Sequence, residues 1–125
     1  MDMALERVMT ALTHAVTDPR GRWLLGPQQD ARSELRMTTV AGGEYFDHVI
    51  DRTFRDANGQ RWVVDYKTSS HEGADIEGFL NREQERYHVQ LDRYATLMRL
   101  VDGQAVRRGL YFPLLKGWRE WGDDG

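Results

Sequence analysis

Asp65 and Lys67 are the residues whose types and spacing most directly suggest chemistry. They follow an apolar run, residues 62–64, that is typical of a buried strand. Because side chains alternate between the two faces of a strand, Asp65 and Lys67 point to one side and Tyr66 to the other. A carboxylate beside an ammonium group can form a solvated ion pair at a sheet edge or belong to an active site. Which interpretation holds depends on the residues that lie opposite.

Two registers are open to the hairpin formed by residues 45–55 and 61–68. A two-residue turn would mix apolar and charged side chains on both of its faces. A three-residue loop with Gly59 in the left-handed conformation pairs Asp56 with Gln60 and separates the two kinds of side chain. We therefore predict the second register.

That register places Asp51 opposite Asp65, with Val49 opposite Lys67. The other side of the hairpin becomes apolar, with Phe54 facing Trp62 and Ile50 facing Tyr66. Two carboxylates in facing positions of a strand pair repel each other. They are tolerated when one is protonated, when Lys67 neutralises them, or when a cation lies between them. Hard divalent ions such as Mg²⁺ are held by one or two carboxylates, with waters and substrate phosphates as further ligands.

The remaining sequence predicts the elements that position these residues. Apolar residues at helical spacing predict a first helix over residues 3–17, and they are Leu5, Val8, Met9, Leu12 and Val16. We expect a turn at 18–21, strands at 33–40, 45–55 and 61–68, a loop at 69–78, a helix at 82–101 capped by Asn81, and a strand at 106–113. A strand–helix–strand connection of this length returns parallel. The predicted fold is thus α/β, in the order α-β-β-β-α-β, with an antiparallel three-stranded meander and a parallel fourth strand in a mixed sheet flanked by helices.

Length and composition limit the classes of protein. The 125 residues, 40% hydrophobic and 30% charged, predict one globular domain. A net charge of −3 argues against a module that holds nucleic acid by bulk electrostatics, and the absence of cysteine excludes thiolate metal sites. No membrane helix, signal peptide, phosphate-cradling loop or serine triad is visible, so we expect a cytoplasmic protein that binds neither membrane nor nucleotide.

A set of short motifs resembles a known nuclease family. The set comprises Ile50-Asp51-Arg52, Val64-Asp65-Tyr66-Lys67-Thr68-Ser69 and Tyr87 with Gln90-Leu91 and Tyr94. It looks like the RecB/AddA-type nuclease domain of the PD-(D/E)XK superfamily, which has a restriction-endonuclease-like core and often lies at the C-terminus of UvrD-like helicases. The resemblance covers residues 23–121.

The resemblance implies a role for each matching residue. Asp51 and Asp65 would bind Mg²⁺, for which Mn²⁺ can substitute, and Lys67 would activate the attacking water. Gln90 and Tyr94 match the family's QxxxY motif, near the DNA and with Tyr87 beside them. Glu34 matches a further acidic position that can bind metal.

The family also carries a metal-binding histidine on a helix well upstream of the first strand, and His14 does not match that position. We therefore expect residues 1–125 to be a single nuclease-like domain from the C-terminus of a larger helicase or exonuclease. The resemblance implies DNA as a partner, with helicase domains in cis or a helicase subunit in trans, in DNA repair or recombination. A catalytically inert DNA-binding or scaffolding module of the same fold is the alternative.

Overall fold

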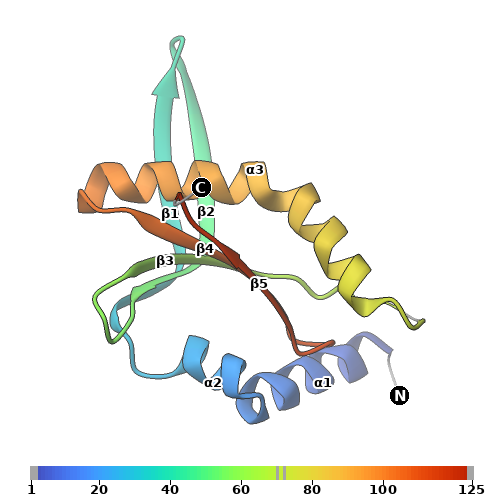
Figure 1. The fold of residues 1–125 in the computed structure, drawn as a ribbon. Helices are drawn as coiled ribbons and strands as arrows, with labels where there is room; N and C mark the ends of the chain where they lie inside the picture. Colours follow the sequence, from blue (N-terminus) through green and yellow to red (C-terminus); the bar gives the residue numbers. More distant parts are fainter. Residues whose placement is uncertain (1–2, 70, 72, 124–125) are drawn as a thin grey trace.

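A five-stranded sheet lies between α3 on one face and the pair α1 and α2 on the other (Figure 1). The computed structural model describes residues 3–69, 71 and 73–123. Its elements are α1 (Met3–Thr17), α2 (Pro19–Leu25), β1 (Gln29–Ala41), β2 (Glu44–Arg55), β3 (Arg61–Tyr66), α3 (Ile76–Asp102), β4 (Val106–Phe112) and β5 (Gly117–Trp121). The strands lie in sequence order, and the tip of the β1–β2 hairpin projects past α3.

The predicted mixed α/β sheet is confirmed, with two additional short elements. β3 and β4 pair in parallel, and the other neighbouring strands pair antiparallel. The turn predicted at 18–21 is instead the start of α2, because Pro19 stands at the first helical position, where its missing N–H is not needed. The C-terminal segment pairs with β4 as β5, a strand that the sequence did not predict.

Helix α3 begins six residues earlier than predicted, inside the expected loop. Its N-cap is Asp75, whose side chain accepts a hydrogen bond from the Gly78 N–H at 3.0 Å, and not Asn81. Ser70 and Glu72 of the expected loop lie outside the described residues. The helix ends at Gly103, whose φ of 74° is the left-handed conformation that glycine adopts readily.

The β2–β3 register is the one that the turn chemistry predicted. The Asp56 N–H donates to the Gln60 carbonyl at 3.0 Å, and Phe54 lies opposite Trp62. Gly59 has a φ of 79°, as the three-residue loop requires.

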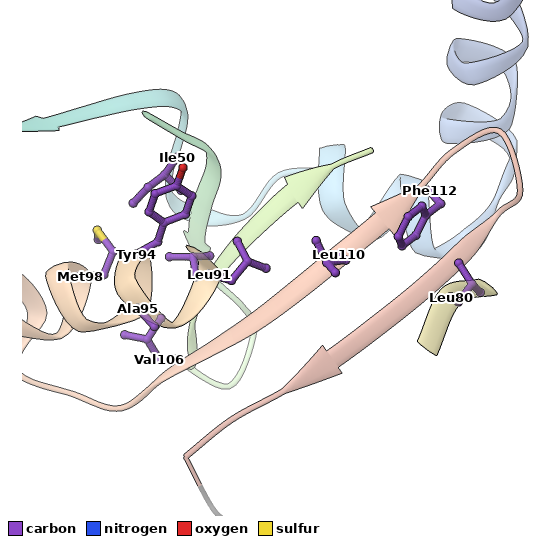
Figure 2. Close-up of a cluster of buried hydrophobic side chains, with 10 residues drawn as sticks. Ile50, Leu80, Leu91, Tyr94, Ala95, Met98, Val106, Leu110 and Phe112 are labelled. Carbon is purple, nitrogen blue, oxygen red and sulfur yellow. The ribbon is translucent and has the colours of Figure 1, made fainter. Parts of the chain in front are cut away.

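One predicted contact of this hairpin is wrong, because Ile50 does not share a face with Tyr66. Ile50 packs with Leu91 and Tyr94 of α3 (Figure 2), whereas Tyr66 packs on the side of α1 and α2. The last regular β2–β3 pair joins Arg52 to Val64, and beyond it β2 no longer follows the alternation set by β3. The irregularity extends to β1. Glu34 lies between Ser33 and Leu35, which both pair with β2, and its φ is 53°.

Two apolar clusters hold the layers together. The cluster under α3 contains Leu91, Ala95 and Leu110, each 0% exposed. The cluster on the opposite face contains Ala15 of α1, Leu24 of α2 and Trp62 of β3. Both faces of β3 are therefore covered, and the polar end of this strand emerges from a buried sheet. Within the described residues, no helix is both long and apolar enough to cross a membrane.

Candidate active site

Asp65 and Lys67 lie where β3 leaves the sheet, and β4 fixes the backbone of both. Asp65 is paired with Leu110 of β4 and is only 3% exposed. The Lys67 N–H donates to the Tyr111 carbonyl at 2.9 Å, which continues the parallel pairing past the end of the strand. The two side chains thus project from a rigid segment.

Asp51 reaches the same place from β2. Its Oδ2 accepts the Tyr66 N–H at 3.0 Å, so a carboxylate occupies the position of a strand partner just beyond the last regular pair. This bond explains why β2 departs from β3 here, because a side chain has replaced the backbone acceptor. The predicted proximity of Asp51 and Asp65 follows from this arrangement.

The carboxyl groups of Asp51 and Asp65 lie close together, and this proximity and the burial of Asp65 affect the pKa of Asp65. Burial, and after it the negative charge of Asp51, raise the pKa of Asp65 from 3.8 to about 6. The ammonium group of Lys67 opposes both effects. The pair therefore holds one of its negative charges only weakly, and a cation bound between the carboxylates would favour the charged form.

Lys67 is held by two contacts. Its Nζ lies 3.4 Å from Asp65 Oδ2 and 3.9 Å from the centre of the Tyr87 ring on α3. The side chain is 19% exposed, so the ammonium group remains open to a ligand while the ring and the carboxylate fix its direction. Arg86 lies 5.2 Å above the same ring and adds positive charge at the rim.

Tyr94 of α3 lies near enough to the acid pair for both carboxylate charges to affect its pKa, and Gln90 is bonded to Tyr94. The Gln90 side-chain amide donates to the Tyr94 hydroxyl oxygen at 2.8 Å, which leaves the hydroxyl proton able to donate elsewhere. Burial raises the pKa of Tyr94; the hydrogen bond from Gln90 opposes this, and the charges of Asp65 and Asp51 raise it further. The structure thus brings Asp51, Asp65, Lys67, Tyr87, Gln90 and Tyr94 together.

Glu34 is the predicted site residue that the structure does not bring into this group. It lies on β1 across from Asp51, but it is exposed. Among the described residues, no three histidine, aspartate or glutamate side chains gather closely enough to hold a metal ion. Two carboxylates alone still fit Mg²⁺, which commonly takes one or two protein carboxylates and completes its shell with water and phosphate oxygens.

The sequence did not predict two contacts of the site, those of His48 with Tyr94 and of Lys67 with Tyr87. His48 of β2 lies edge-on to the Tyr94 ring at 6.4 Å between ring centroids, and its Nε2 lies 3.2 Å from Thr39 Oγ1. Strand alternation places His48 on the same side as Ile50, but the sequence assigned that side to the wrong face and so did not locate His48 beside α3. The contact between Lys67 and Tyr87 had no such signal, because it depends on how α3 crosses β3.

Comparison with known proteins identifies the family to which the chain belongs. A family model described as "PD-(D/E)XK nuclease superfamily" matches residues 4–119. No curated protein matches the sequence. A solved structure described as "Crystal structure of SSO0001" is 16% identical with a TM-score of 0.36; the match covers 94% of this chain and 50% of that one. The chain therefore spans half the length of that structure.

Proposed function

Because the chain belongs to the PD-(D/E)XK nuclease superfamily, we propose that it hydrolyses phosphodiester bonds of DNA at the Asp51–Asp65 pair with bound Mg²⁺ or Mn²⁺. The observation that carries the proposal is the pair formed by the buried Asp65 and the half-buried Asp51 beside an ammonium group, in which the pKa of Asp65 is raised to about 6. A bound divalent ion would supply a water of lowered pKa and would neutralise charge on the phosphate.

The residues of this chain divide the remaining work. Asp51 and Asp65 would hold the ion, and its positive charge would offset the repulsion between the two ionised carboxylates. Lys67, positioned by Asp65 and Tyr87, would place positive charge beside the attacking water and the phosphate oxygens. Tyr94, with its hydroxyl proton available, would donate to the substrate, and Gln90 orients that hydroxyl.

We also propose the context that the motifs imply. The order of the motifs Asp51, Asp65-Lys67 and Gln90-Tyr94 resembles the RecB/AddA type, so the domain would act within a helicase–nuclease of DNA repair or recombination. Helicase domains would lie in cis or on a separate subunit.

Metal binding and cleavage test the proposal separately. Mg²⁺ and Mn²⁺ are titrated calorimetrically into the chain and into Asp51→Asn, and cleavage of linear and single-stranded DNA is followed with and without a chelator. We expect binding and cleavage in the wild type and neither in Asp51→Asn. Glu44→Gln, an exposed change at the base of the β1–β2 turn, serves as the control that should retain both.

The presence of only two gathered carboxylates among the described residues favours one alternative, a catalytically inert DNA-binding module. Such a module would bind DNA without cleaving it in either ion. Failure to bind a divalent ion at millimolar concentration would remove the metal-site proposal.

Replacing Tyr87 tests how Lys67 is positioned. Tyr87→Leu removes the ring beneath Lys67 Nζ and is expected to lower the cleavage rate about tenfold, whereas Tyr87→Phe keeps a ring face and should stay near the wild-type rate. Metal affinity should change little in both, because Tyr87 contacts Lys67 and not the carboxylates. Equal rates for the two variants would show that the ring does not position the lysine.

A further inference from the structure

Helix α1 contacts the rest of the molecule through only part of its surface. His14 Nδ1 lies 2.7 Å from the Pro113 carbonyl oxygen, and Ala15 is the buried residue of the helix. Ala15 packs so closely on α2 that a Cβ at Gly21 would lie 2.3 Å from its carbonyl oxygen. These contacts fix the orientation of α1 and determine which residues face outward.

The apolar stripe of α1 faces outward. The residues that form this stripe are Leu5, Val8, Met9, Leu12 and Val16, which are 51–60% exposed. Their spacing is that of a helix face that packs against another element. Single exposed apolar residues are ordinary in proteins, but a continuous stripe on one helix indicates an interaction surface.

An apolar pocket lies at the C-terminal end of this stripe. Its volume is about 180 Å³, and its lining includes Leu12 and Ala15 of α1, Leu24 and Leu25 of α2, and Tyr66 of β3. Leu12 therefore belongs both to the stripe and to the pocket wall, and Leu25 is also 49% exposed. A pocket with this lining suits an apolar side chain from a partner.

We propose that this surface binds a second copy of the chain, with α1 antiparallel to α1 of the partner around a two-fold axis beside Val8 and Met9. In that arrangement Leu5 of each copy meets the pocket beside Leu12 of the other. The two positions are seven residues apart, about 10 Å along the axis. A two-fold interface requires one surface to carry both the projecting side chain and its complement, and α1 carries both at opposite ends.

The area fits a pair of copies. The five exposed residues present on the order of 500 Å² of apolar surface per copy. A symmetric pair would bury roughly 1,000 Å² of surface in total, near the lower limit of a specific interface.

The position of α1 keeps this interface apart from Lys67. α1 lies on the sheet face opposite to α3 (Figure 1), whereas Lys67 contacts Tyr87 of α3, so pairing through α1 does not involve Lys67. The proposal is therefore independent of the proposed function.

Sedimentation velocity measures the pairing directly. We expect the 125-residue chain to form dimers with a micromolar Kd and Val8→Glu to be monomeric, with the circular dichroism spectrum of the wild type. Leu100→Glu, which places the same charge at a 79% exposed leucine on α3, should still dimerise. A wild type that stays monomeric at about 100 µM, or a Val8→Glu chain that dimerises like the wild type, would overturn the proposal.

The absence of cysteine allows the helix orientation to be tested by cross-linking. Leu5→Cys mixed with Leu12→Cys should form a disulfide-linked pair under mild oxidation, whereas Leu5→Cys alone should not, because a disulfide needs Cα atoms within about 7 Å. Efficient cross-linking of Leu5→Cys to itself would indicate a parallel arrangement and contradict the antiparallel one.

Discussion

Asp65→Asn is expected to abolish DNA cleavage and, without metal, to make the chain harder to unfold at pH 7.5. The loss of a metal-binding carboxylate should lower the cleavage rate by about a thousand-fold or more. The gain in stability arises because burial, reinforced by Asp51, raises the pKa of Asp65 from 3.8 to about 6. At about 1.4 kcal/mol per pKa unit, ionised Asp65 destabilises the fold by about 3 kcal/mol. Since asparagine also weakens the contact with Lys67, we expect a net gain of about 1–3 kcal/mol.

The difference in stability between Asp65→Asn and the wild type should depend on pH, because Asp65 binds its proton more tightly in the folded chain than in the unfolded chain. Between pH 4 and 6 the unfolded chain ionises Asp65 while the folded chain keeps the proton, so the stability of the wild type falls as the pH rises through this window. Below about pH 4 the residue is protonated in both states, and the advantage of asparagine should disappear. Urea unfolding at several pH values measures the effect.

Added Mg²⁺ should reverse the order of stability, because an ion that binds only the folded wild type stabilises it. The control is Asp47→Asn, an exposed aspartate on the β1–β2 hairpin, which should match the wild type in both assays. An asparagine variant that cleaves DNA, or that is less stable than the wild type at pH 7.5, would contradict the assignment of Asp65.

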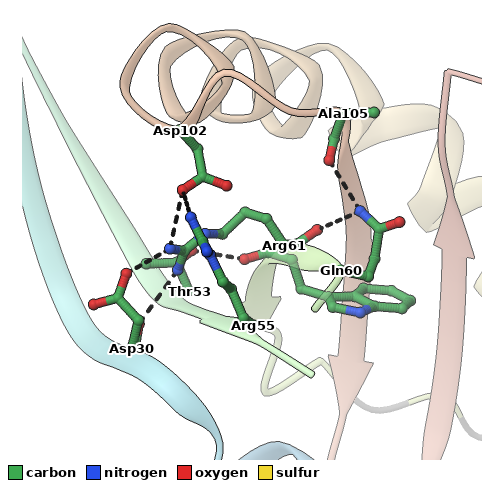
Figure 3. A network of polar contacts seen from close by, with 8 residues as sticks. Asp30, Thr53, Arg55, Gln60, Arg61, Asp102 and Ala105 are labelled. Carbon is green, nitrogen blue, oxygen red and sulfur yellow. Dashed lines mark hydrogen bonds and ion pairs between the residues drawn. The ribbon is translucent and has the colours of Figure 1, made fainter. Parts of the chain in front are cut away.

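Asp102→Asn is expected to cause the largest loss of stability, about 3–5 kcal/mol. Asp102, the last residue of α3, accepts hydrogen bonds from Arg55 of β2 and Arg61 of β3 (Figure 3). The Arg61 side chain is 2% exposed and also pairs with Asp30 of β1 at 2.5 Å. Loss of the Asp102 charge leaves two neighbouring guanidinium groups with Asp30 as the remaining carboxylate of this network. Urea unfolding at pH 7 measures the change.

An exposed ion pair supplies the comparison for Asp102. Asp47 and Arg36 lie 3.9 Å apart with side chains 59% and 71% exposed, so Asp47→Asn should change stability by less than about 0.5 kcal/mol. If Asp102→Asn lowers the free energy of unfolding by less than about 1 kcal/mol, Asp30 alone is sufficient to neutralise Arg55 and Arg61.

Local patterns predicted the parts of the site that lie close together in sequence. The loop ending at Gly59 determines the β2–β3 register, and the register brings Asp51 to Asp65. The parallel pairing of β3 with β4 follows from the length of the connection between them. These features depend on turn geometry and strand alternation, which a sequence displays directly.

Features that depend on tertiary contacts were not predictable in the same way. Ile50 was assigned to the wrong face because the carboxylate of Asp51 replaces a backbone acceptor and interrupts the alternation of β2. β5 has too few residues for a pattern to appear. The contact between Lys67 and Tyr87 depends on the path of α3 across the sheet, and the exposure of the α1 stripe depends on which side of α1 meets Pro113.

The parallel pairing of β3 with β4 has a consequence for the order in which the site assembles. Asp51 and Asp65 are joined by a short hairpin, whose closure is a fast and local step. The Lys67 N–H finds its acceptor, Tyr111, only after the 27 residues of α3 have formed and returned the chain to the sheet. We therefore expect the repelling carboxylates to come together early in folding and the backbone of Lys67 to be fixed late. Until β4 docks, we expect a proton on the acid pair to relieve the repulsion.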